Sequence, residues 1–275
     1  MPELFSMPFF TRSFLVLTAS GISFPVLGAF ILNLELIAAR FAVMHAALLG
    51  GALGLLFGIN ISMMSMLAAV LSGIGIAFIS YRGKVSAGGS LGLIMTVCMG
   101  LAFIIFYKSN VQAVSAFSLF WGNILSLTEG DVRLALAVAG GIFTFLLSCY
   151  KEVHIVLFDR EIAWAVGVRA KLVYALIMLS VCVGVAAAMR ITGALLVDAV
   201  TLLPALAARR LGRSFKALIL LGAAFGLAMN LSGFALSFIL DLPVSSSIIV
   251  VGGLTILTMQ GVDFLRKKYE QRTIF

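Results

Sequence analysis

Nine long apolar stretches limit what this chain can fold into more than any other feature. A helix needs roughly 20 apolar residues to cross about 30 Å of hydrocarbon. Stretches of that kind lie at 13–33, 41–58, 62–80, 88–107, 132–149, 171–188, 190–208, 217–239 and 245–264. They are continuously apolar, without the period-two alternation of barrel strands. The sequence therefore predicts an all-α, polytopic transmembrane helix bundle.

The composition agrees with this class and excludes a soluble domain. The chain is 62% hydrophobic, and its mean hydropathy is +1.18. The seventh stretch contains the acid Asp198 as well as Pro204, which favours a broken or partial crossing. We therefore expect eight or nine spans, and residues 1–275 to form a single transmembrane domain.

Lysine and arginine are unevenly divided between the two sides that this topology creates. With the C-terminal tail inside and nine alternating segments, fifteen of the nineteen basic residues fall inside and four outside. Cytoplasmic loops carry such an excess. This cytoplasmic excess accounts for the net charge of +8. The sequence has no basic tract interleaved with aromatic residues, so it does not indicate nucleic acid as a partner. We expect the tail and the loop at about 151–171 to be cytoplasmic.

Residues with catalytic chemistry are few. Cys98, Cys149 and Cys182 are scattered without the spacing of a redox or zinc motif, which indicates packing. The stretch RGKVS (82–86) lacks the first glycine and the final hydroxyl residue of a Walker A loop, and we interpret it as a cytoplasmic turn. No nucleophile–base pair is apparent. The sequence predicts neither an enzyme nor an ATP-binding chain.

Two further patterns point to helix packing. Glycines recur every fourth residue at Gly50, Gly54 and Gly58, and again at Gly222 and Gly226, a spacing that lets helices approach closely in lipid. The methionines at 63, 64 and 66 are soft ligands of the kind that bind Cu(I). Their place at the start of a segment favours packing instead.

The loop at 151–171, KEVHIVLFDREIAWAVGVRAK, holds seven of the thirty charged residues. A short amphipathic helix is expected to start near Asp159 and stop near Gly167, because an acid suits a helix start and glycine a helix end. Its apolar side would comprise Phe158, Ile162, Ala163, Trp164, Val166 and Val168. The residues alone leave two roles open, resting on lipid headgroups or docking a cytoplasmic partner.

Five motifs, in this order along the chain, resemble those of one family. LFDREIAWAVGV (157–168) resembles the coupling loop of the metal-type ABC importer permeases, which serve zinc, manganese and iron uptake. The family pattern, Phe-Asp-x-Glu-x-Ala and then glycine, is matched by Phe158, Asp159, Glu161, Ala163 and Gly167. The other motifs are MPFFTRSFLV (7–16), MHAALLGGALG (44–54), TGALLVDAVTLLPALAARRL (192–211) and LSFILDLPVSSSIIVV (236–251).

The resemblance implies a function and a set of partners. The chain would be the membrane-spanning permease subunit of an importer in a bacterial-type cytoplasmic (inner) membrane, paired with an identical or a related permease. Its coupling loop would dock on separate ATPase subunits, which hold ATP and magnesium, so that no cofactor resides in this chain. An external solute-binding protein would deliver the substrate. The alternative outside the family is a self-sufficient secondary transporter, which commonly carries an internal repeat that is not found here.

A metal pathway requires ligands at membrane depth, where a charged side chain is costly and is a functional candidate. Asp198 is the only acid near the middle of a predicted span, and His45 keeps the family's histidine position. The structural alternatives are that Asp198 pairs with an arginine or caps a helix broken around Pro204, and that His45 donates to a backbone carbonyl. The family's aspartate, four residues before the histidine, is Phe41 here; Leu49 replaces a proline and Ser245 a glycine.

The broken ligand pair leaves three possibilities for the substrate. The metal is held by another set, such as His45 with Asp198; the substrate is not a typical divalent metal; or a related partner permease carries the missing ligand.

Overall fold

The computed structural model describes residues 7–81, 87–109 and 124–272, and the expected turn at 82–86 lies outside them. Within these ranges the chain is helical and contains no strand. The elements, in chain order, are α2 (Pro8–Asn33), α3 (Ile37–Phe57), α4 (Ile61–Tyr81), α5 (Ala87–Lys108), η1 (Ile124–Ser126), α7 (Glu129–Ser148), α8 (Tyr150–Phe158), α9 (Arg160–Ala165), α10 (Ala170–Thr192), α11 (Ala194–Leu211), α12 (Phe215–Ile239) and α13 (Val244–Arg272).

The helices follow the predicted apolar stretches closely, and this confirms the fold class. Of the described helices, seven are long and apolar enough to cross a bilayer, and α4 adds a shorter apolar helix over Ile61–Ile76. Helix α11 is the remaining candidate, with 18 residues of which three are charged. The total agrees with the expected eight or nine spans.

One predicted boundary is wrong. The stretch expected at 190–208 does not begin at residue 190, because α10 continues to Thr192 and α11 starts at Ala194. The break falls at Gly193, whose φ of 79° is a backbone conformation that L side chains rarely adopt.

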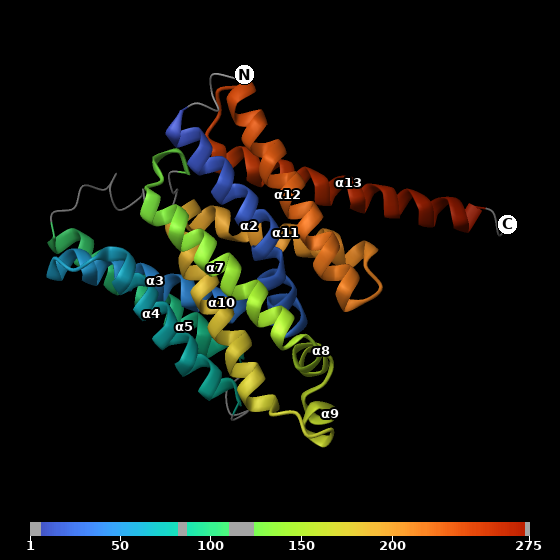
Figure 1. Cartoon of the computed structure of the whole chain (residues 1–275), viewed down its shortest axis with the longest axis horizontal. Coiled ribbons are helices and arrows are strands. Elements are labelled where there is room, and N and C mark those ends of the chain that lie inside the picture. The colour runs from blue at the N-terminus through green and yellow to red at the C-terminus, as the bar shows by residue number, and fades with distance from the viewer. Residues whose placement is uncertain (1–6, 82–86, 110–123, 273–275) are drawn as a thin grey trace.

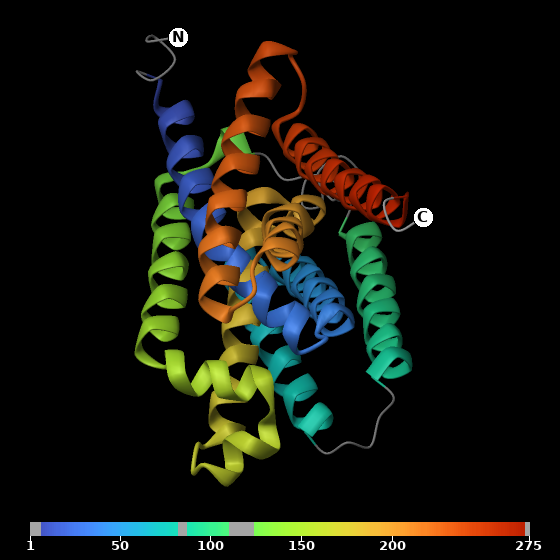
Figure 2. The same cartoon turned by 90° about the vertical axis from the view of Figure 1, so that its right-hand side faces the viewer.

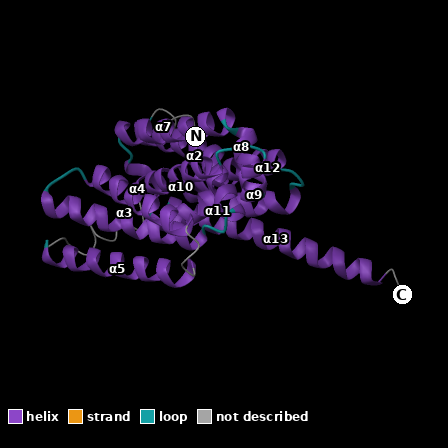
Figure 3. Ribbon diagram, turned by 90° about the horizontal axis from the view of Figure 1, so that it is seen from below, coloured by secondary structure: helices purple, strands orange, loops and turns teal. Residues whose placement is uncertain are grey.

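Helices α2, α3, α10 and α11 form most of the interior of the bundle. Most residues of α2, α3 and α10 are buried, whereas α5 and α13 are largely exposed. Figure 2 and Figure 3 show α5 and α7 on opposite sides of these central helices. The C-terminal part of α13 extends away from the other helices (Figures 1 and 3).

Glycines allow the closest helix crossings, as their spacing predicts. A Cβ added to Gly226 on α12 would lie 2.1 Å from the carbonyl oxygen of Gly21 on α2, and one added to Gly50 on α3 would lie 2.4 Å from that of Met64 on α4. Gly58 differs from the other glycines of its series. It ends α3 with a φ of 65° and has nothing within 4 Å of an added Cβ, so it stops the helix and does not pack.

The start of α2 and the α8–α9 segment lie at opposite ends of the molecule (Figures 1 and 2). Helix α2 connects these ends, since Asn33 to Glu35, after its last turn, line one groove together with Val156 to Glu161. At the N-terminal end, Arg12 pairs with Glu129 at 2.9 Å and Arg190 pairs with Asp131 at 3.1 Å.

Candidate functional site

The charged loop contains a short helix that its own side chains start. Asp159 precedes α9, and its Oδ1 accepts hydrogen bonds from the backbone N–H groups of Glu161 at 2.7 Å and Ile162 at 3.0 Å. A capping carboxylate of this kind pairs N–H groups that have no partner inside the helix. The predicted helix start near Asp159 is confirmed.

Glycine ends the same helix. Gly167 has a φ of 82°; its N–H donates to the carbonyl of Trp164 at 3.0 Å, and the N–H of Val168 donates to that of Ala163 at 2.9 Å. This pair of bonds is the Schellman motif, in which a left-handed residue just past the helix satisfies the last carbonyls. The helix is shorter than its apolar pattern indicated, because α9 ends at Ala165.

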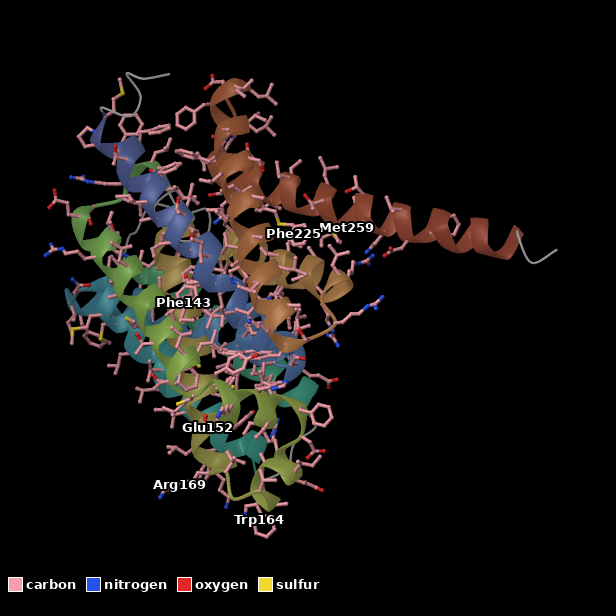
Figure 4. All side chains as sticks on the ribbon, turned by 45° about the vertical axis from the view of Figure 1, so that its right-hand side comes forward. Phe143, Glu152, Trp164, Arg169, Phe225 and Met259 are labelled. Atoms are coloured by element: carbon pink, nitrogen blue, oxygen red, sulfur yellow. The ribbon has the colours of Figure 1, made fainter. Side chains whose placement is uncertain are left out.

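The apolar residues of the loop do not lie on one side, which corrects the predicted amphipathic pattern. Phe158 is 79% exposed and Trp164 77%, and Ile162 and Val166 are exposed as well. Ala163 is fully buried and packs inward. Figure 4 shows Trp164 at the tip of the segment, directed away from the bundle. The loop therefore presents an apolar surface of Phe158, Ile162, Trp164 and Val166 to the outside of the molecule.

A cation–π contact attaches this surface to the bundle. The guanidinium of Arg160 lies 4.2 Å from the ring centroid of Tyr174 on α10. At the preceding helix, the ring of His154 on α8 stacks on Phe215, the first residue of α12, with a centroid separation of 5.2 Å. The loop thus contacts both α10 and α12.

His45 lies in the buried middle of α3 and is 7% exposed. Its Nδ1 is 2.8 Å from the carbonyl oxygen of Phe41. Since a carbonyl only accepts, Nδ1 carries the hydrogen of this bond, and in the neutral imidazole Nε2 keeps its lone pair. The backbone bond considered from the sequence is therefore present, and it fixes the tautomer that a metal ligand requires.

Asp198 lies in the second turn of α11 and pairs with Arg40 of α3. The Arg40 side chain is completely buried, whereas that of Asp198 is 41% exposed. The guanidinium also lies 4.4 Å from the ring centroid of Phe41. An arginine partner for Asp198 was one of the expected alternatives, and it comes from a helix distant in sequence.

Sequence reasoning missed the role of Arg40, because it was counted only among the cytoplasmic charges. Its side chain does not reach water. The only local signal was its position, directly before Phe41, at the start of an apolar stretch.

On α3 and on α11, one narrow stripe of residues is only partly covered by the rest of the chain, and this stripe is called half-open. On α3, Phe41, Leu49 and Leu53 are partly exposed among buried neighbours, and His45 stands between them at the same four-residue spacing. On α11, Asp198, Leu202 and Leu206 form the equivalent stripe. Residues four apart share a helix face. His45 and Asp198 thus lie on the faces of their helices that this chain covers least.

The described residues contain no group of three or more histidine, cysteine, aspartate or glutamate side chains that could hold a metal ion. Met63 and Met66 lie in a cavity of about 770 Å³ that also contains Asp131 and Arg190. Met63 is 67% exposed there, so it does not pack in the interior as the sequence indicated.

Comparisons with known proteins agree with this architecture. Residues 6–261 match the ABC 3 transport family. The manganese transport system membrane protein MntC of Listeria monocytogenes is 24% identical over 250 residues, covering 90% of this chain and 88% of that protein. The manganese import system permease protein ScaB of Streptococcus parasanguinis is 23% identical over 249 residues, covering 90% and 89%. The structure of PsaBC from Streptococcus pneumoniae in complex with Fab superimposes with a TM-score of 0.81 at 22% identity, covering 94% of each chain. The chain belongs to the ABC 3 transport family and is the membrane-spanning permease of an ABC transporter whose ATPase is a separate subunit.

Proposed function

We propose that this permease imports a divalent transition metal ion, with manganese, zinc and iron as the candidates. The observation that carries the proposal is His45, an imidazole at membrane depth on a half-open helix face, with Nδ1 occupied by a carbonyl and Nε2 free to bind. Relatives named as manganese transport proteins support the same substrate class. Membership of this family, in which a separate subunit is the ATPase, also argues against a self-sufficient secondary transporter.

The proposed ligands are His45 and Asp198. One imidazole and one carboxylate from each of two chains, related by a two-fold axis, give four nitrogen and oxygen ligands. Such a set suits Zn(II), Mn(II) or Fe(II) better than a soft ion. The half-open stripes of α3 and α11 would then face the pathway between the two chains. The second chain is either a copy of this one or a related permease.

We propose that the apolar surface of the loop docks on the ATPase subunit. Phe158, Glu161 and Trp164 are exposed, so they can enter a cleft on a partner, while Asp159 and Gly167 shape the helix and Ala163 holds it to the bundle. Large aromatic side chains of this kind dominate binding energy at protein interfaces. The remaining proposed partners are a solute-binding protein outside a bacterial-type inner membrane, and ATP with magnesium in the ATPase.

The substrate proposal is tested by manganese, zinc and iron uptake into vesicles that contain the assembled transporter. His45→Ala and Asp198→Asn should each reduce ATP-dependent accumulation of the transported metal at least tenfold, because each removes a proposed ligand from the pathway. Asp263→Asn is the matched control for Asp198→Asn, since Asp263 is an exposed acid on α13 that pairs with Arg210 and belongs neither to the proposed ligands nor to the loop. Unchanged uptake by both pathway variants would assign His45 and Asp198 structural roles only.

The docking proposal is tested by co-purification with the ATPase subunit. Trp164→Ala should weaken the association by at least tenfold, because this side chain is 77% exposed at the tip of the loop. Leu147→Ala on α7 is the control, since its side chain is 75% exposed but belongs to a membrane-facing helix. Equal association of the two variants would leave the loop as an interfacial helix resting on lipid.

A further inference from the structure

Arg40 is a fully buried, positively charged side chain in the part of the chain that is proposed to bind the metal ion. Burying a charged group is costly unless it is paired. Among the described ion pairs, its acidic partner is Asp198, one of the two proposed metal ligands. Its other charge-related contact is the face of the Phe41 ring, at 4.4 Å. The guanidinium of Arg40 therefore lies against the carboxylate that would bind the metal.

The two sides of the Asp198 carboxylate differ. Oδ1 is inaccessible to solvent and is the oxygen that contacts Arg40. The side chain as a whole is 41% exposed, so its accessible surface lies away from Oδ1. A carboxylate has two oxygens and can contact one cation at each. Asp198 can thus keep Arg40 on its buried side while its open side meets a second cation.

We propose, on the basis of the proposed metal substrate, that Arg40 is a resident counter-cation that sets the metal affinity of this site. Paired with Asp198, it cancels the single negative charge that each chain contributes, so an incoming dication meets a neutral site. In a membrane interior of low dielectric, the guanidinium also repels a metal bound to the same carboxylate. Arg40 thereby keeps metal binding weak, which favours release during transport.

The same geometry explains what Phe41 does. Its ring lies against the guanidinium and brings no negative charge to it. A carboxylate at position 41 would be a second acidic partner for Arg40, and Asp198 would then be less neutralised. Arg40 and Phe41 together therefore determine how much negative charge is left for the metal.

The test is equilibrium Mn²⁺ binding to the purified, assembled transporter, without ATP. Arg40→Gln should bind Mn²⁺ at least tenfold more tightly than the wild type, because Asp198 loses its resident cation. Arg40→Lys, which keeps the charge, should remain within threefold of the wild type. Arg210→Gln is the control, since Arg210 also pairs with an acid, Asp263, at 2.9 Å, but on a part of α11 away from Asp198. It should leave the affinity unchanged.

A second variant keeps the inference testable if Arg40→Gln does not fold. Arg40→Met removes the charge but keeps a long side chain that suits the buried position, and it should also tighten Mn²⁺ binding at least tenfold. If the folded variants bind no more tightly than the wild type while the wild type does bind, Arg40 is a structural partner only and the metal substrate stands. If the wild type and both variants bind none of Mn²⁺, Zn²⁺ and Fe²⁺, the metal substrate and the role of Arg40 are both wrong.

Discussion

The crossing of α2 and α12 allows a stability prediction whose size follows from the structure. A Cβ on Gly226 would lie 2.1 Å from the carbonyl oxygen of Gly21 and 2.7 Å from Cγ of Pro25, and ordinary contacts begin near 3.4 Å. Neither the backbone of α2 nor a proline ring can rotate aside. Gly226→Ala therefore has to move the two helices apart by about 1 Å in a closely packed interior.

Separating the helices also affects a buried hydrogen bond one turn further along. The Nδ2 of Asn230 donates to the carbonyl oxygen of Leu17 at 2.9 Å, and Asn230 is 1% exposed. Overpacking costs about 1–3 kcal/mol, and a weakened buried hydrogen bond adds about 1 kcal/mol. We expect the free energy of unfolding to fall by about 2–4 kcal/mol, where each kcal/mol lowers the melting temperature by roughly 2–4 °C for a chain of this size.

The assay is thermal unfolding of the detergent-purified permease, with Gly253→Ala on α13 as the matched control. An added Cβ at Gly253 meets nothing within 4 Å, so its only effect is the better helix propensity of alanine. The control should melt at the wild-type temperature or slightly above it. If Gly226→Ala is as stable as Gly253→Ala, the close approach of α2 and α12 does not contribute to stability and the reasoning from the glycine contacts is wrong.

The remaining predictions concern the loop, the nucleotide and the topology. Asp159→Ala should destabilise α9 by about 1 kcal/mol and weaken ATPase association, whereas Asp159→Ser, which restores a cap, should not; equal co-purification would contradict this. Gly167→Val should weaken the same association, because a φ of 82° costs an L side chain about 1–2 kcal/mol, and Gly167→Asn should be tolerated. The permease purified without its ATPase should neither bind nor hydrolyse MgATP, which a nucleotide-binding and turnover assay checks. Single cysteines at Gly212 and Tyr269 should react only with membrane-permeant reagents, and labelling of intact cells by an impermeant reagent would reverse the orientation.

The sequence by itself determined the fold class and the positions of the helices. Apolar runs of membrane-spanning length leave a helix as the way to pair their backbone groups, so the pattern and the structure agree to within a few residues. The start and end of α9 were also predictable, because Asp159 and Gly167 act on their own backbone neighbours. These features depend on interactions between residues close together in the chain.

Only the tertiary structure decided which side chains meet across helices. Asp198 pairs with Arg40, 158 positions away in the chain, although Arg190 on α10 and Arg209 on α11 are much nearer in sequence. The structure also decided that Ala163 faces inward while Trp164 faces out. The physical reason is that helix periodicity defines the faces of each helix but not the rotation and crossing of one helix against another, which depend on how all the side chains pack together.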